Sequence, residues 1–277
     1  MNNFQTRLLS GIVYIAILCL GILVNELSAH ILFLSLSFLA LREYRTISKK
    51  SLDTPRYYIS FILGIHIYIY FNLDFFNAYF PSIGFSDKSF VTLNIGLLFY
   101  LEMILLLINY KTQASKHILT SIFSYVYSVL PFALAVPFSK VYNIGDYNGY
   151  SVLYVFIFIW ASDTFAYLVG RKFGKNKLFE AVSPKKTWEG FIGGGILTVL
   201  LGVVISLLTD ENMLPMSILA LLAFIFGSIG DLIQSTFKRT VDIKDSSNLI
   251  PGHGGILDRL DSFIFAMPII YLIFSSI

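Results

Sequence analysis

The chain consists mostly of apolar runs long enough to cross a lipid bilayer. A transmembrane helix needs about 20 predominantly apolar residues. Nine segments of the 277-residue sequence approach or reach that length. They are about 8–24, 28–44, 57–73, 90–109, 118–138, 150–170, 190–208, 214–234 and 259–276. The runs lack the alternation of barrel strands, and only helices and closed barrels satisfy the backbone in lipid. The sequence therefore predicts an all-α, polytopic integral membrane protein with about nine transmembrane helices.

Composition agrees with this class. Charged residues make up 13% of the chain, whereas soluble domains average roughly 25%. No small-residue cleavage site follows the first run, so we expect an uncleaved first span rather than a signal peptide. The single cysteine, Cys19, excludes a disulfide within the chain.

The basic residues predict an orientation, because cytoplasmic loops of membrane proteins carry an excess of Lys and Arg. With the N-terminus inside, 18 of the 20 Lys and Arg fall on the inner side, and only Lys88 and Lys140 fall outside. Loops 171–189 and 235–258 are then cytoplasmic. We expect two parts: residues 1–145 with five spans, and a catalytic part, 146–277, with four. The basic segment 42–56 is expected to bind anionic lipid headgroups.

The most polar stretch, 235–261, lies between the last two spans. Charge is costly near a bilayer and marks a functional site. Asp231, Ser235 and Lys238 recur at helical spacing, as do Asp258 and Asp261 at the start of the last span. Clustered carboxylates repel one another unless a cation lies among them. Asp231, Asp258 and Asp261 are therefore predicted to hold Mg²⁺, which favours carboxylates and substrate phosphates.

Two other polar segments are expected at the same face. Asp163 and Tyr167 share one face of the sixth span, where an acid either binds a ligand or hydrogen-bonds a neighbouring helix. Ser183 before Pro184 predicts an N-cap that opens the seventh helix. Lys186 and Thr187 would then lie in a first turn that binds phosphate through free backbone N–H groups. Lys185 and Lys186 are equally consistent with the positive-inside rule and no ligand.

Two further residues each fit two different roles. Glu189 is either a capping acid or a metal ligand. His253, in a glycine-rich loop, contacts a phosphate or base, or satisfies the loop backbone. Gly193, Gly194 and Gly195 are expected to allow close helix packing.

The motifs resemble those of the phosphatidate cytidylyltransferases, also called CDP-diacylglycerol synthases. Residues 235–261 follow that family's succession of Ser, Lys-Arg, Lys-Asp, Pro-x-His-Gly-Gly and Asp-Arg-x-Asp. Segments 163–170 and 183–190 are similar to two further family blocks, and the motifs together cover about 160–262. In the N-terminal half only Glu43-Tyr44 loosely resembles a family feature.

The resemblance implies an enzyme of phospholipid biosynthesis, in which CTP and phosphatidic acid form CDP-diacylglycerol and pyrophosphate. The expected cofactor is Mg²⁺, with a second cation. The expected catalytic residues are Asp231, Lys238, Arg239, Asp258 and Asp261. The expected substrate-binding residues are Asp163, Tyr167, Ser183, Lys186, Thr187, Lys244, His253 and Arg259.

The expected place of action is the cytoplasmic side of a bacterial inner membrane. The partners there are CTP, phosphatidic acid and the lipid bilayer, with no nucleic acid. The resemblance also implies a homodimer.

Other functions fit parts of the sequence. One is a CTP-dependent transferase or kinase that acts on a polyprenol or an ether lipid. Another is an ion-coupled transporter that uses Asp163, Glu102 and Asp231, although no inverted repeat supports it. A membrane scaffold would leave the clustered aspartates unexplained.

Overall fold

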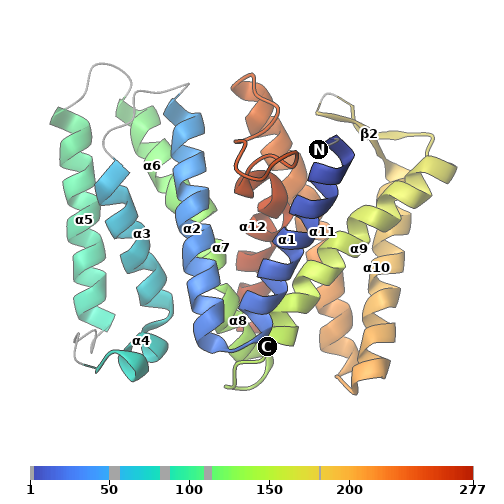
Figure 1. Cartoon of the computed structure of the whole chain (residues 1–277), viewed down its shortest axis with the longest axis horizontal. Coiled ribbons are helices and arrows are strands. Elements are labelled where there is room, and N and C mark those ends of the chain that lie inside the picture. Colours follow the sequence, from blue (N-terminus) through green and yellow to red (C-terminus); the bar gives the residue numbers. More distant parts are fainter. Residues whose placement is uncertain (1–2, 50–56, 82–87, 109–113, 181, 277) are drawn as a thin grey trace.

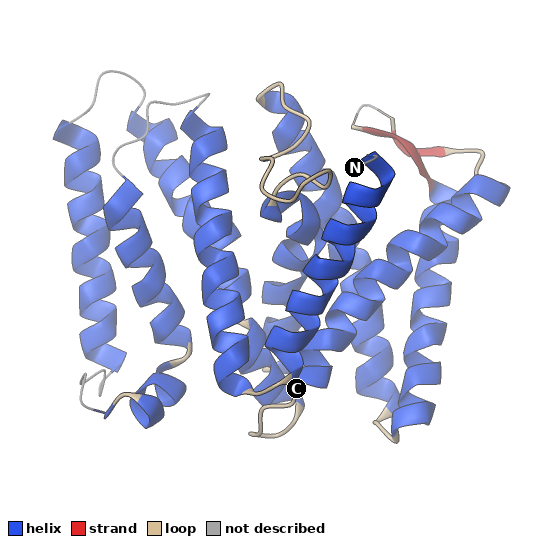
Figure 2. Cartoon of the chain, viewed as in Figure 1, coloured by secondary structure: helices blue, strands red, loops and turns tan. Residues whose placement is uncertain are grey.

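The computed structural model describes residues 3–49, 57–81, 88–108, 114–180 and 182–276, and these are almost entirely helical (Figures 1 and 2). The helices are α1 (Asn3–Leu23), α2 (Glu26–Lys49), α3 (Tyr57–Phe71), α4 (Leu73–Tyr79), α5 (Lys88–Ile108), α6 (Ala114–Ser128), α7 (Leu130–Ala133), α8 (Ala135–Tyr142), α9 (Gly149–Phe173), α10 (Trp188–Thr209), α11 (Met213–Thr240) and α12 (Ile256–Phe274). The strands are β1 (Lys177–Phe179) and β2 (Ser183–Thr187).

Each predicted span coincides with a helix or a broken helix. In the described part of the chain, five helices are long and apolar enough to cross a membrane, or up to seven if each bent pair is one span. The five are Gln5–Leu23, Glu26–Ser48, Gly149–Phe173, Trp188–Thr209 and Met213–Thr240. The helical membrane-protein class is thus confirmed, whereas the count of nine and the orientation stay predictions.

Two predicted spans are bent. Residues 57–73 end at a 91° bend between α3 and α4, where the Asn72 amide donates hydrogen bonds to the carbonyls of Tyr68 and Ala133. Residues 118–138 are divided into α6, α7 and α8, with a 41° bend before α8. Pro131 lies in the first turn of α7, and proline lacks the N–H that continues a helix.

Helix α12 is central to the core. The Phe263 ring stacks on Phe156 of α9 at a centroid distance of 4.6 Å, and also on Phe33 of α2 and Phe132 of α7. One continuous core therefore joins helices of both predicted parts. The predicted boundary at residue 145 falls in the turn between α8 and α9.

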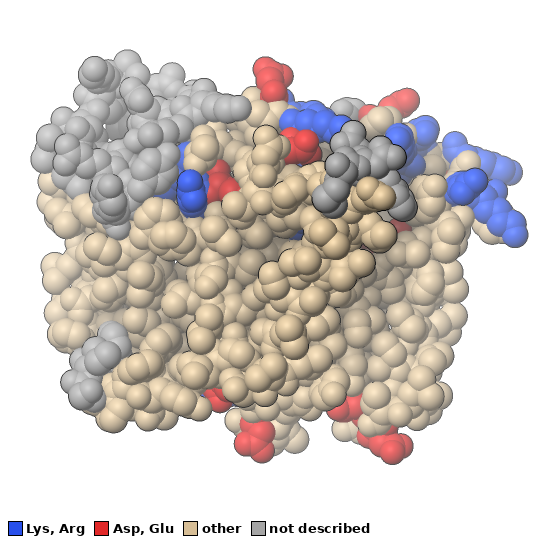
Figure 3. Space-filling view, viewed as in Figure 1, with Lys and Arg blue, Asp and Glu red and all other residues tan. Residues whose placement is uncertain are grey.

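Charged residues gather at the two ends of the bundle. On the visible face, Lys and Arg gather at the end that carries the hairpin, and the charged residues at the opposite end are acidic (Figure 3). The expectation that segment 42–56 binds headgroups is wrong for Arg45. Its side chain is 2% exposed, and Nη2 lies 2.7 Å from Glu102 Oε1. Lys50, Arg56 and Lys111, also assigned to the inner side, lie outside the described residues.

A short β-hairpin departs from the all-helical prediction. β1 and β2 pair antiparallel, with Lys177 opposite Thr187 and Phe179 opposite Ser183. Ser183 is therefore not a helix N-cap, and Lys186 and Thr187 do not lie in a first helical turn. The residue before a proline favours extended backbone, which suits Ser183 to a strand. The actual N-cap of α10 is Thr187, whose side chain accepts a hydrogen bond from Gly190 N.

Small residues bring α9 and α10 together next to this hairpin. A Cβ added to Gly194 would lie 2.9 Å from the Cα of Ala166, closer than real Cβ atoms come. A Cβ on Gly190 would lie 2.7 Å from the carbonyl oxygen of Ala166. Gly193 and Gly195 are placed as tightly, against Val169 and Phe224. The expectation that Gly193, Gly194 and Gly195 allow close helix packing is confirmed.

Candidate active site

A cavity of about 830 Å³ opens at the hairpin end of the bundle. The N-terminus, the hairpin and the loop between α11 and α12 all lie at this end (Figure 1). Ten predicted site residues line the cavity: Asp163, Tyr167, Ser183, Lys186, Thr187, Asp231, His253, Asp258, Arg259 and Asp261. They come from α9, β2, α11, the loop and α12, so the fold brings together motifs that are far apart in the sequence.

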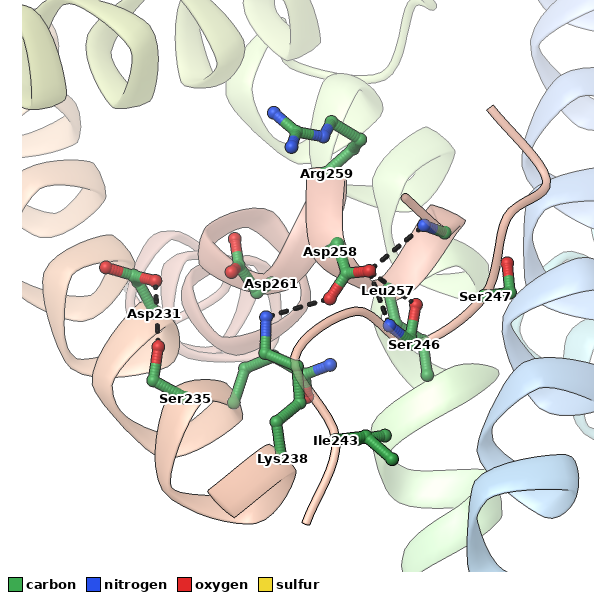
Figure 4. Close-up of polar contacts among 12 residues, drawn as sticks. Asp231, Ser235, Lys238, Ile243, Ser246, Ser247, Leu257, Asp258, Arg259 and Asp261 are labelled. Atoms are coloured by element: carbon green, nitrogen blue, oxygen red, sulfur yellow. Dashed lines mark hydrogen bonds and ion pairs between the residues drawn. The ribbon is translucent and has the colours of Figure 1, made fainter. Parts of the chain in front are cut away.

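Asp258 organises the start of α12. Its Oδ2 accepts hydrogen bonds from the backbone N–H groups of Ser246 (2.6 Å) and Gly255 (3.0 Å), while Oδ1 lies 2.8 Å from Lys238 Nζ (Figure 4). Gly254, with φ +91°, allows this approach, because a Cβ there would lie 2.7 Å from Asp258 Oδ2. Asp258 thus holds the polar loop and the Lys238 ammonium in place.

Asp231 and Asp261 offer carboxylates with few protein donors. Asp231 forms an ion pair with Lys186 and lies 3.4 Å from the Ser235 hydroxyl. Asp261 accepts a hydrogen bond from Ser262 N at 2.7 Å. In Figure 4 the Asp261 side chain lies between those of Asp231 and Asp258. The charges of Asp231 and Asp261 are near enough to interact electrostatically.

The donor chemistry of these acids suits Mg²⁺, which binds proteins through one or two carboxylates and keeps positions for substrate phosphates. Asp231 and Asp261 fit that role, and Asp258 Oδ1 retains a lone pair beside its contact with Lys238. Among the described residues, no three acidic, histidine or cysteine side chains already converge as a metal cage.

Asp163 and Tyr167 lie on α9 and line the cavity, as their spacing predicts. Asp163 is close enough to Lys186 and Asp231 to interact with both charges. The polar cluster therefore extends across the cavity from α12 through α11 to α9.

The hairpin forms another part of the cavity wall. Ser183, Lys185, Lys186 and Thr187 of β2 line the cavity, and Lys186 reaches Asp231 of α11. The Glu189 carboxylate accepts hydrogen bonds from the backbone N–H groups of Lys175 and Asn176. Glu189 thus fastens the start of the hairpin, whereas the N-cap of α10 is Thr187.

His253 links the loop to α1. Its Nδ1 lies 2.8 Å from the Ser10 hydroxyl, which also lies 2.9 Å from the carbonyl oxygen of Pro251. Burial, followed by the charges of Arg259 and Arg7, lowers the pKa of His253 below its ordinary value. A neutral imidazole therefore faces the cavity at pH 7.

The chain is similar to known proteins over nearly its whole length. Residues 5–277 match the family described as "Cytidylyltransferase family". The chain belongs to this family. A protein of Bacillus subtilis named phosphatidate cytidylyltransferase is 30% identical over 99% of this chain and 98% of its own length. Its counterpart by name in Haemophilus influenzae is 34% identical over 95% of this chain and 96% of its own length. The likeness to this cytidylyltransferase family thus includes the N-terminal helices.

Not every basic residue predicted for the site reaches the cavity of this cytidylyltransferase-family chain. Arg239 is exposed, and its guanidinium lies 3.5 Å from the carbonyl oxygen of Ile243. Lys244 is exposed and does not line the cavity. Lys238 does not line it either but reaches its wall through Asp258.

Glu43 of α2 holds the loop and the start of α12 beside the cavity, a role that the sequence did not predict. It is 6% exposed, and its carboxylate accepts hydrogen bonds from Ile256 N (2.9 Å) and Leu257 N (3.0 Å). The hydroxyls of Ser246 and Ser247 lie 3.0 and 2.6 Å from it. The only signal in the sequence was the loose likeness of Glu43-Tyr44 to a family feature.

Proposed function

We propose that this protein transfers the cytidylyl group of CTP to phosphatidic acid, which forms CDP-diacylglycerol and releases pyrophosphate in phospholipid biosynthesis. The observation that carries the proposal is the cavity, in which acids from three helices face lysines of the hairpin at one end of a membrane-spanning bundle. Family membership supports the same reaction class.

The two ends of the cavity suit two different substrates. Ile15, Ile159 and Trp160 form an apolar part of the wall on α1 and α9, which suits the acyl side of a lipid. Lys185 and Lys186 lie on the hairpin beyond the helices and suit the phosphates of a nucleotide. Phosphatidic acid would enter from the bilayer and CTP from water.

In the proposed reaction, an oxygen of the phosphatidate phosphate forms a bond to the α-phosphorus of CTP. The bond between that phosphorus and the bridging oxygen to the β-phosphate breaks, and pyrophosphate leaves with the electron pair. The attacking oxygen is already an anion, so no side chain has to remove a proton. The work of the protein is positioning and charge neutralisation.

Asp231 and Asp261, with Asp258, would hold Mg²⁺ and a second cation. When bound, the metal neutralises negative charge on the reacting phosphates. Lys186, released from Asp231, would bind phosphate oxygens of CTP. Arg259 lines the cavity one residue from Asp258 and would hold the lipid phosphate.

The proposed location is a bacterial inner membrane with the cavity on the cytoplasmic side. The excess of Lys and Arg at the hairpin end supports this orientation. The relatives from Bacillus subtilis and Haemophilus influenzae support a bacterial setting. We also propose that the protein forms a homodimer, as the family resemblance implies, and the mass of the purified protein in nanodiscs would test this.

The test uses purified protein in detergent–phosphatidate micelles with Mg²⁺ and α-labelled CTP. We expect label to enter the lipid with release of one pyrophosphate per transfer, and Asp261→Asn to abolish both. Asp210→Asn, at the far end of α10, is the matched control and should leave the rate unchanged. Transfer of label to a polyprenol but not to phosphatidate would show that the lipid acceptor is a polyprenol. Transport of intact CTP without transfer would reject the reaction.

A further inference from the structure

Helix α1 forms one wall of the cavity, although sequence patterns gave the N-terminal half little chemistry. Gly11, Tyr14 and Ile15 line the cavity, and their spacing of three and four residues puts them on one helix face. The other faces of α1 are exposed, with Leu8, Leu9, Ile12 and Val13 at the surface. Because α1 is a candidate membrane span, it separates lipid from the cavity.

The position of α1 against the polar loop is fixed by specific contacts. Ser10 contacts Pro251 and His253, as described above. Gly11 lies directly beside the imidazole, since a Cβ there would be in van der Waals contact with His253 Cε1, at 3.4 Å. Tyr14 is one helical turn further along α1 and is thereby held against the cavity.

The Tyr14 hydroxyl is buried and has no hydrogen-bond partner within the described part of the chain. It lies near the charges of Arg259 and Asp261. A buried hydroxyl without a partner is costly, and such groups are rare in folded proteins. Phenylalanine would fill the same space without this cost. A bound ligand that accepts a hydrogen bond from this hydroxyl would explain why the position carries tyrosine.

Two observations favour the lipid substrate as that ligand. Tyr14 lies on the helix that borders the bilayer, beside Ile15 of the apolar wall. The hairpin lysines, which suit the nucleotide, are on a different wall. We propose that the Tyr14 hydroxyl donates a hydrogen bond to a phosphate oxygen of the lipid substrate. This inference rests on the proposed function and adds a substrate-positioning residue from the N-terminal half.

The decisive variant is Tyr14→Phe, because it removes only the hydroxyl. We expect the KM for phosphatidate to rise roughly 10- to 100-fold, the range for a hydrogen bond to a charged group. The KM for CTP and the Mg²⁺ concentration for half-maximal rate should not change. Without substrate, the Tm of Tyr14→Phe should equal or exceed that of the parent. Tyr100→Phe is the matched control, because Tyr100 is 70% exposed on α5 and does not line the cavity.

An unchanged KM for phosphatidate would overturn the inference. A rise confined to the KM for CTP would assign the hydroxyl to the nucleotide, and a rise confined to the Mg²⁺ requirement would assign it to Asp261. Both results would overturn it as well.

A binding measurement separates this inference from the proposed function. In phosphatidylcholine nanodiscs, added phosphatidate should raise the Tm of the parent protein and of Tyr100→Phe more than that of Tyr14→Phe. An equal shift in all three would reject the role of Tyr14. Failure of the parent protein to transfer label would reject the reaction and leave this lipid-binding result intact.

Discussion

The Glu43 carboxylate accepts a hydrogen bond from the backbone N–H of Leu257, at 3.0 Å and 214 residues further along the chain. The bond joins the C-terminal part of α2 to the first turn of α12. Free N–H groups at a helix N-terminus are stabilised by a negative charge. Ser246 extends the link, because its hydroxyl lies 3.0 Å from Glu43 Oε2 and 2.9 Å from Asp258 Oδ2. The N-terminal half thus positions the acids of the cavity.

Glu43→Gln should therefore impair both stability and activity. An amide has one acceptor oxygen, so its NH₂ group would face donors that the carboxylate now satisfies. Each buried donor left unpaired costs about 1–3 kcal/mol, and we expect a lower Tm and a lower kcat. Thermal unfolding and label transfer measure the two effects. Glu211→Gln, at the opposite end of the bundle, should change neither. A Glu43→Gln enzyme with full activity would refute the positioning role.

The sequence predicted the helices well but not every contact at the site. Long apolar runs predict spans without knowledge of the partners, because burial in lipid depends on hydropathy alone. The hairpin was missed because Ser183–Thr187 is too short and polar for periodicity, and its pairing with Lys177–Phe179 depends on where α9 ends. Glu43 was missed because its partners are backbone groups of a distant helix. Arg239 and Lys244 were expected at the site from the family resemblance, and a sequence motif does not reveal which way a side chain points.

The ion pair between Lys238 and Asp258 should matter more for the fold than an exposed pair. The Asp258 side chain is 3% exposed and that of Lys238 is 14% exposed. Removing one partner of a buried pair costs roughly 3–5 kcal/mol, because the other charge stays buried. We expect Lys238→Met to lower the Tm sharply and the double variant with Asp258→Asn to recover part of it without activity. Lys88→Met on α5 is the control. Equal Tm values for Lys238→Met and Lys88→Met would contradict this account.

Substitution by alanine should have opposite effects at Gly194, where α9 and α10 meet, and at Gly96 of α5. Gly194→Ala would put a Cβ 2.9 Å from Ala166 and force the two helices apart beside the cavity. We expect a lower Tm and slower transfer. Gly96→Ala in α5 meets no atom of the described residues within 4 Å and should stabilise the helix by about 0.5–1 kcal/mol. Thermal unfolding in the same detergent compares them. A neutral Gly194→Ala would show that the helices separate at little cost.

His253 predicts a pH dependence of stability. Burial lowers the pKa of its imidazole below the ordinary 6.5, and the charges of Arg259 and Arg7 act in the same direction. The unfolded chain then binds the proton more readily than the folded protein. The contribution of neutral His253 is complete above pH 6.5 and is lost as the pH falls through the lowered pKa. We expect the Tm of the parent protein to fall more between pH 7.5 and pH 5.5 than that of His253→Asn. Parallel Tm curves would contradict the lowered pKa.

Arg45 and Glu102 form a second buried ion pair, which supports the fold rather than the chemistry. Their side chains are 2% and 4% exposed. The hydroxyls of Ser60, Ser121 and Tyr125 also reach the Glu102 carboxylate. Neither partner of the ion pair lines the cavity.

A double-mutant cycle tests whether the Arg45–Glu102 ion pair affects stability without affecting the transfer reaction. Arg45→Met alone should destabilise the protein by roughly 3–5 kcal/mol, because it strands the Glu102 charge, whereas the pair Arg45→Met and Glu102→Gln should recover much of the loss. The KM values for CTP and phosphatidate should stay unchanged in whatever fraction remains folded. Additive losses would show that the two charges do not stabilise each other. Changed KM values in the folded fraction would connect this pair to the cavity and to the transfer reaction.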